Sequence, residues 1–210
     1  MAKGIVLQLQ EEALDDSVNI ETLLRKALLV AHKLKLKEFE EWILKEQNGY
    51  KEEPPEYRII GGEIKAQNPY HGWVPVIMPS KIAEKLNKMP MTHPIATIAD
   101  AYNGSNGSIS FTVSGELTEF LNSNSGTFPT DFCFHSNKTE LRKIISAVRN
   151  RILEWSLLLE ENGIIGDELK FTDSEVKTAQ DSQVINNYTN NFYSSVGNSQ
   201  IQQGGNNNQQ

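Results

Sequence analysis

The chain has 210 residues, a formal net charge of −7 and a single cysteine, Cys133, which excludes an intrachain disulfide. It contains no run approaching the ~18 apolar residues that a membrane-spanning helix needs. The apolar run near its start is too short for a signal peptide, so we expect a soluble cytoplasmic protein, and its acidic balance argues against a general nucleic-acid coat.

The first quarter of the sequence predicts three helices. A short helix is expected over residues 5–15, and Asn19 then caps a second helix whose apolar residues recur at helical spacing through Leu34. A third helix follows and ends at Gly49, a residue typical of helix C-termini. Its apolar side comprises Leu36, Phe39, Trp42 and Ile43.

The middle of the chain changes to patterns typical of strands. Residues 57–64 and 73–78 are strand candidates, and the turn-forming residues 68–72 lie between them. Pro75 lacks an amide donor, which predicts that the second strand is an edge strand or contains a bulge. Apolar and polar residues alternate over 109–113 and predict a half-buried strand.

Two short helices and one more strand complete this region. One helix is expected to begin at Ser80 and to stop before Pro90, and another has Pro94 as its first residue. A further short strand is suggested by Phe128, Phe132 and Phe134.

The strongest helical pattern lies between Asn137 and Gly163. Asn137 and Glu140 approximate a capping box, and Gly163 followed by Ile164 predicts a Schellman stop. The expected buried seam consists of Leu141, Ile145, Val148, Ile152, Trp155 and Leu159. This spacing predicts lengthwise packing against another helix. The fold class is therefore α+β: a helical bundle with a small antiparallel sheet, plus an Asn/Gln-rich C-terminal tail.

Two stretches of the sequence are especially distinctive. Residues 68–73 read Asn-Pro-Tyr-His-Gly-Trp, and residues 149–155 read Arg-Asn-Arg-Ile-Leu-Glu-Trp. Together with shorter stretches at 24–28, 36–43, 47–50 and 55–58, they resemble the AbiTii domain, named from bacterial abortive-infection systems. The resemblance covers residues 5–165. It implies a role in phage defence, as a module beside effector or sensor parts, and it carries over no catalytic residues.

The first candidate binding site is the cluster of Asn68, Tyr70, His71 and Trp73. An imidazole between two aromatic rings suits a base, a peptide or a phosphate. The alternative is structural, with Tyr70 and Trp73 packed beneath a turn and His71 bonded to the backbone.

The second candidate group is basic and comprises Arg142, Arg149 and Arg151. Arg149-Asn150-Arg151 invites comparison with the motif of HEPN ribonucleases, in which a histidine follows the arginine. Glu154 occupies the histidine position, so the motif is broken. A solvated helix face with internal ion pairs is the alternative, and the same holds for the basic run over 25–37, which could contact phosphates.

The histidines and Cys133 show no spacing typical of a metal site, and no glycine-rich phosphate loop ends in Lys-Ser/Thr. We therefore predict no metal, no cofactor and no catalytic residues.

The C-terminal 28 residues differ from the rest. We divide the chain into a domain at 1–165, an acidic linker at 166–182 and an uncharged tail at 183–210, half of which is Asn or Gln. Asn186-Asn187-Tyr188-Thr189 is echoed by Asn190-Asn191-Phe192-Tyr193. Such a tail could stack between chains in extended form, or it could remain a disordered linker. The candidate self-association residues are Val184, Tyr188, Phe192, Val196 and Ile201.

The resemblance implies phage defence, and together with the patterns above it leads us to expect an interaction module whose body senses or docks a protein partner and whose tail supports homo-oligomerisation. The alternative is a divergent ribonuclease-type toxin that uses Arg149, Arg151 and His71. A nucleic-acid-binding regulator is a third hypothesis and is not favoured.

Overall fold

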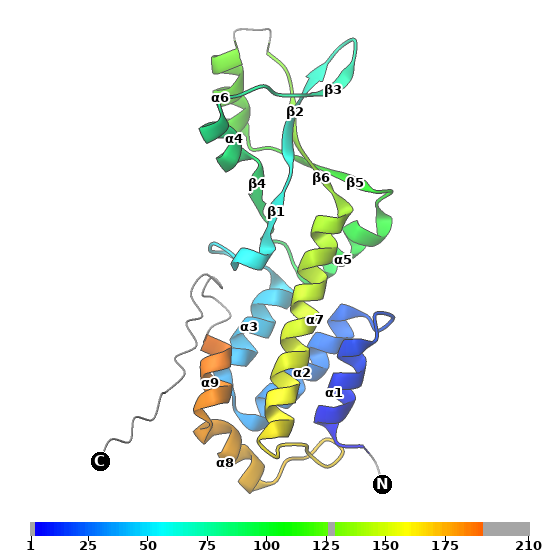
Figure 1. The fold of residues 1–210 in the computed structure, drawn as a ribbon, viewed down its shortest axis with the longest axis vertical. Coiled ribbons are helices and arrows are strands. Elements are labelled where there is room, and N and C mark those ends of the chain that lie inside the picture. The colour runs from blue at the N-terminus through cyan, green and yellow to red at the C-terminus, as the bar shows by residue number, and fades with distance from the viewer. Residues whose placement is uncertain (1–2, 126–128, 191–210) are drawn as a thin grey trace, which may run out of the picture.

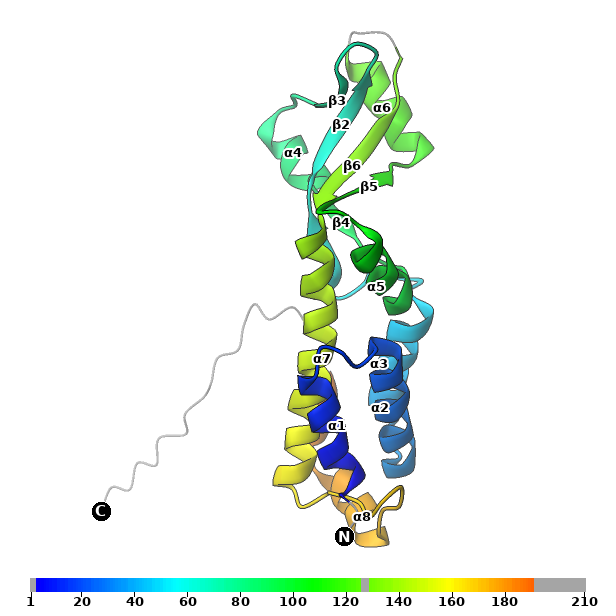
Figure 2. The same cartoon turned by 90° about the vertical axis from the view of Figure 1, so that its right-hand side faces the viewer.

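A computed structural model describes residues 3–125 and 129–190 of the chain. The molecule is elongated, with a helical body at one end and a sheet with short helices at the other (Figures 1 and 2). Helix α7 (Lys138–Glu161) starts directly after the sheet and runs along the length of the body. The predicted α+β class is confirmed.

The body is built from α1 (Ile5–Leu14), α2 (Ile20–Leu34), α3 (Lys37–Asn48) and α7, and α1 lies beside α7. As predicted, the Asn19 side chain caps α2 by accepting hydrogen bonds from the amides of Glu21 and Thr22.

Gly49 ends α3 at a φ of 87°, as predicted. A Cβ atom at this position would lie 2.7 Å from the Thr92 carbonyl oxygen, so the close approach of the two segments also requires glycine.

The sequence prediction for α7 needs two corrections. Ile144, rather than Ile145, is fully buried on the seam, and Ile145 is only partly buried. The reason is that α7 contacts α1, α2 and α5 together, so its buried band is wider than a two-helix seam. The capping box does not form either: Asn137 accepts from the Thr139 amide, while the Glu140 carboxylate accepts from the Gly61 amide at 3.1 Å.

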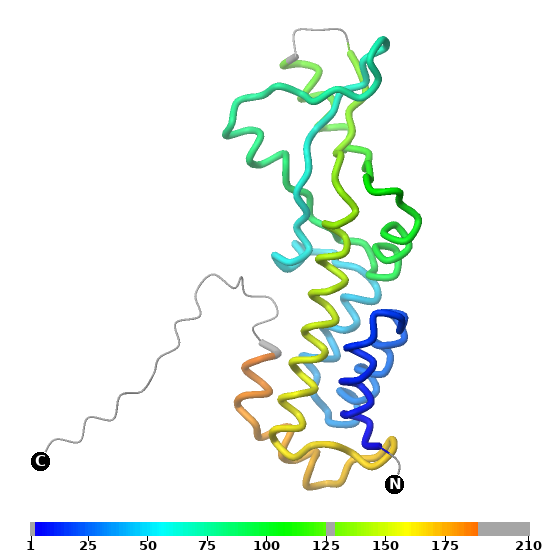
Figure 3. Tube along the Cα trace, turned by 45° about the vertical axis from the view of Figure 1, so that its right-hand side comes forward, coloured from blue at the N-terminus to red at the C-terminus, as the bar shows by residue number. Residues whose placement is uncertain are grey.

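The C-terminus of α7 is the Schellman motif that Gly163 predicts. The Ile164 amide donates to the Leu159 carbonyl at 2.9 Å and the Gly163 amide donates to the Glu160 carbonyl at 2.8 Å. The chain then passes the start of α1, where the Val6 amide donates to the Ile165 carbonyl (Figure 3).

The main sheet has four antiparallel strands in the order β3-β2-β6-β5. Their bounds are β2 (Glu63–Asn68), β3 (Gly72–Pro75), β5 (Ser108–Thr112) and β6 (Phe132–Asn137). Pro75 lies on an edge strand, as predicted. Ile64 pairs with Phe134, which pairs with Phe111, so apolar residues line one face of the sheet.

The strand predicted over 57–64 is interrupted. A 3-10 helix, η1 (Glu56–Arg58), comes first, and β1 (Ile59–Gly61) pairs with β4 (Lys88–Pro90), a strand that we did not predict. Gly62 lies between β1 and β2. A Cβ atom at this position would lie 2.5 Å from the Phe134 ring, so the close approach requires glycine.

The remaining helices of this end are α4 (Ser80–Leu86), α5 (Ile95–Gly104), whose N-cap is Pro94, and α6 (Gly115–Ser125). Helix α6 was not predicted, and Phe128 of the proposed Phe-rich strand lies outside the described residues.

The segment that we expected to be an acidic linker contains helix α8 (Asp173–Asp181), and the start of the expected tail forms α9 (Gln183–Asn190). Helix α8 packs on α2, and α9 packs on α3 and α7. Ala179 and Ile185 are fully buried, so these residues are part of the body. Among the residues that the structure describes, none of the helices has the length and apolar character needed to cross a membrane.

Candidate functional site

The hairpin formed by β2 and β3 carries the first predicted cluster. The Asn68 carboxamide oxygen accepts hydrogen bonds from the Tyr70 amide at 2.9 Å and from the His71 amide at 3.0 Å, which fixes the turn. Gly72 follows at a φ of 70° and leads into β3. The turn therefore holds the cluster in one backbone conformation.

The side chains of this hairpin are turned toward solvent. Tyr70 is 89% exposed and Trp73 is 46% exposed, and His71 is exposed as well. The structural alternative, in which Tyr70 packs beneath the turn, is not what the structure shows. Ile77, just beyond β3, is 99% exposed, and sequence patterns did not single it out. The hairpin lies at the end of the molecule opposite α8 (Figure 1).

The guanidinium of Arg149 is bound by backbone carbonyls. It donates to the carbonyl oxygens of Glu12, Asp15 and Val18 at the C-terminal end of α1, and the side chain is buried. Burial lowers the pKa of Arg149, and the opposing attraction of two aspartates is smaller. The cation therefore binds the partly negative C-terminal end of α1 and the loop that follows it.

Of the three arginines in the second candidate group, Arg142 and Arg149 line the same cavity and Arg151 does not. A cavity of about 450 Å³ is lined by Arg142, Ser146 and Arg149 of α7, by Tyr102 of α5 and by the loop before α2. Arg151 lies about 200° around the helix from Arg149. Its guanidinium is 3.8 Å from the centre of the Tyr57 ring.

Sequence analysis missed a buried charged network where the body meets the sheet. Glu46 and Arg58 are both fully buried and form an ion pair of 2.6 Å. The other Glu46 oxygen accepts from the hydroxyls of Tyr50 and Tyr57 at 2.6 Å each. A second nitrogen of Arg58 donates to the Met91 carbonyl at 2.9 Å and to the His93 carbonyl at 2.7 Å. One signal was available: Glu46 continues the spacing of the apolar stripe on α3.

Electrostatics within the network favour the ion pair. Burial first, and then the Glu46 carboxylate, raises the pKa of the Tyr50 and Tyr57 hydroxyls, which remain neutral donors. Burial opposes the charge on Arg58, but Glu46 outweighs it and raises the pKa of the guanidinium. We therefore assign this network a structural role.

Over residues 3–125 and 129–190, no three His, Cys, Asp or Glu side chains come together as metal ligands would. The Ser110 hydroxyl lies 3.0 Å from a ring nitrogen of His135, and burial raises the pKa of the neighbouring Cys133 thiol. A thiol with a raised pKa is a poor nucleophile at neutral pH.

Two of the five self-association candidates can be placed. Val184 is 57% exposed on α9, and Tyr188 is partly buried with its hydroxyl 2.5 Å from a Glu154 carboxylate oxygen. Burial and then Glu154 raise the pKa of Tyr188. Phe192, Val196 and Ile201 lie outside the described residues.

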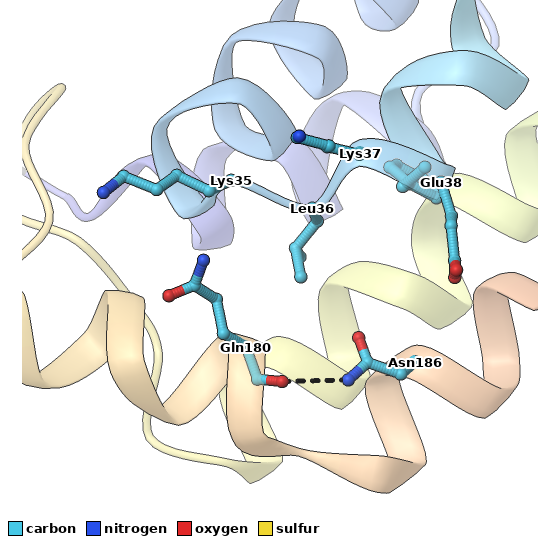
Figure 4. A pocket seen from close by; sticks show the side chains of 7 residues that line it. Lys35, Leu36, Lys37, Glu38, Gln180 and Asn186 are labelled. Carbon is cyan, nitrogen blue, oxygen red and sulfur yellow. Dashed lines mark hydrogen bonds between the residues drawn. The ribbon is translucent and has the colours of Figure 1, made fainter.

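A second cavity of about 450 Å³ lies where α8 and α9 face the turn between α2 and α3 (Figure 4). The side chain of Leu36 points into it, and Gln180 and Asn186 line the opposite side. The Asn186 side chain donates to the Gln180 carbonyl at 2.9 Å and so connects α9 to α8.

The AbiTii family model matches residues 4–184, which extend from α1 into α9. No curated protein and no solved structure gives a significant match.

Proposed function

The chain belongs to the AbiTii family, an abortive infection family, and on that premise we propose that it acts in phage defence as a protein-interaction module. The proposed docking element is the β2–β3 hairpin with Tyr70, His71 and Trp73. The tail that begins at residue 183 provides homotypic assembly, and the cytoplasm is the proposed location.

The observation that carries the docking proposal is the exposure of aromatic side chains on a fixed turn. Tyr70 is almost fully exposed, although burying a side chain of this size is normally favourable. Tyrosine and tryptophan are also the residues that most often dominate the binding energy of interfaces. The Asn68 side chain accepts hydrogen bonds from the Tyr70 and His71 amides and so orders the turn, which lowers the entropy that a partner would lose in ordering it.

The ribonuclease alternative is not favoured, because the three residues that it would use have separate partners and positions. Arg149 binds carbonyls at the end of α1, Arg151 stacks on Tyr57, and His71 lies in the turn between β2 and β3. The basic run over 25–37 is also partly neutralised, because Arg25 pairs with Glu21 and Lys26 pairs with Glu12.

The docking proposal is tested by the double variant Tyr70→Ser/Trp73→Ser in cells that carry the complete defence locus. We expect phage plating efficiency to rise to that of unprotected cells, while the free energy of unfolding changes by less than about 0.5 kcal/mol per exposed site. Leu14→Ser is the matched control, because Leu14 is 70% exposed on the body, and this variant should protect. Full protection by the double variant would exclude the hairpin as the docking element.

A further inference from the structure

The first copy of the four-residue repeat in the tail lies within α9. Asn186-Asn187-Tyr188-Thr189 is helical, and its echo begins with the last described residue, Asn190. Stacking of the repeat between chains requires an extended backbone with side chains alternating between two faces. The helical form and the stacked form of these residues therefore exclude each other.

Helix α9 is held on the body by specific contacts. Ile185 is fully buried where α9 packs against α3 and α7. The Tyr188 hydroxyl donates to Glu154 of α7 at 2.5 Å. The Asn186 side chain donates to the Gln180 carbonyl at the end of α8 (Figure 4). All three residues are within or next to the repeat.

This helix is too short to persist without the body. It has eight residues, and isolated helices shorter than about 12 residues are marginal in water. Its Val, Ile, Asn and Thr residues have low helix propensity, which weakens it further. Leaving the body and losing the helix are therefore one event, which frees the repeat for extended pairing.

Helix α8 remains as the anchor during such a release. Its N-terminus has a capping box between Thr172 and Glu175, and the Glu175 carboxylate also accepts from the Ile165 and Gly166 amides at 3.0 and 2.8 Å. Ala179 is fully buried. The boundary between the fixed and the releasable part is therefore Ser182.

We propose that docking of α9 on α3 and α7 is an autoinhibitory contact that restrains homotypic assembly of the tail. The inference rests on the proposed function, because it assumes that the tail assembles. Body and tail then form a two-state switch: docked and helical, or released and able to pair with the tail of a second copy.

The test uses Ile185→Ala in the full-length chain. In an extended strand Ile185 faces away from Val184 and Tyr188, so the substitution weakens docking and leaves the pairing face intact. Gln183→Ala is the matched control, since Gln183 is exposed on the same helix and in an extended strand also faces away from Val184 and Tyr188. Ile185→Asn, which keeps the tail uncharged, serves as a second and stronger undocking variant.

Two quantities are measured: hydrogen exchange at 183–190, which reports docking, and pelletable assembly over time. We expect Ile185→Ala to lose exchange protection and to assemble about tenfold faster or more than the wild type, whereas Gln183→Ala does neither. Deletion of 191–210 in the Ile185→Ala chain should abolish the assembly.

The outcomes separate the two proposals. If α9 is released and assembly is unchanged, while deletion of 191–210 still abolishes it, the autoinhibitory contact is excluded and tail assembly stands. If no variant assembles even when α9 is released, tail assembly itself fails. A third outcome is that the two undocking variants form a discrete dimer in which the amides of α9 stay protected. In that case α9 is swapped between two copies of the chain, and the autoinhibitory contact is again excluded.

Discussion

At the residue scale, the feature with the largest expected energetic effect is the ion pair of Glu46 and Arg58. Both side chains are fully removed from water, and every nitrogen and oxygen that they present has a partner. Removing one member leaves a buried charge without its counterion, which costs far more than the pair contributes on balance. The pair joins α3 to the segments that lead into β1 and α5.

Arg58→Met should therefore lower the free energy of unfolding by about 3–5 kcal/mol. The matched control is Arg25→Met, which breaks the exposed pair with Glu21 and should cost no more than about 1 kcal/mol. Urea denaturation followed by circular dichroism measures both. Equal losses in the two variants would contradict the role assigned to burial.

Single residues also show where sequence reasoning ends. The side chain of Asn19 is a helix cap because its partners lie two and three residues away, and such local partners can be read from sequence. The partners of Arg149 lie more than 130 residues away along the chain, at the end of another helix. A pattern of arginines on α7 could not distinguish that structural role from a nucleic-acid contact.

At the element scale, the helices with strong periodicity and local stop signals were predicted well. Examples are α2 and α3 and the C-terminus of α7, where the residues that form the apolar stripe or the stop signal lie within or next to the helix. Strand β4 and helix α6 were missed. Strand β4 has three residues and is defined by pairing with β1, which is distant in sequence, so tertiary contacts decide its conformation.

Helix α8 yields a pH-dependent prediction. Burial raises the pKa of the Glu175 carboxyl, but hydrogen bonds from the amides of Thr172, Gly166 and Ile165 outweigh it and leave the pKa below 4.5. A lowered folded-state pKa gives a stabilisation that is complete above the unfolded-state pKa and is lost as the pH falls through the folded value.

The wild type should accordingly be more stable than Glu175→Gln at pH 7, and the difference should shrink as the medium is acidified below pH 4.5. Thermal unfolding of both chains across this pH range is the measurement. Glu161→Gln, at an exposed position at the end of α7, is measured alongside as the control for the substitution itself. A pH-independent difference at Glu175 would contradict the assigned hydrogen bonds.

At the scale of the whole molecule, α7 connects the two ends that the proposals concern. The hairpin lies beyond the start of α7, and α8 and α9 lie against the body along its second half (Figures 1 and 3). The domain boundary that we expected at residue 165 therefore separates parts of the chain that pack together. Ala179 of α8 and Ile185 of α9 are buried, and these two helices pack on α2, α3 and α7.

A chain that ends at residue 165 should be less stable than one that ends at Asn190, which retains α8 and α9. Truncation at residue 165 removes the burial of Ala179, Ile185 and their partly buried neighbours. This lost burial should lower the free energy of unfolding by roughly 2–4 kcal/mol. Guanidinium denaturation of the two truncated chains measures the difference. Equal midpoints would show that residues 1–165 form an independent domain.

The sequence by itself determined the α+β class, the Asn19 cap, the ends of α3 and α7 at Gly49 and Gly163, and the family resemblance, because each can be recognised from patterns of residues that are near one another in the chain. Only the tertiary structure decided that Arg149 binds the end of α1, that Glu46 and Arg58 pair in the core and that the start of the uncharged tail is a helix on the body. These features depend on groups that meet through folding and on water that folding removes, and neither leaves a local pattern in the sequence.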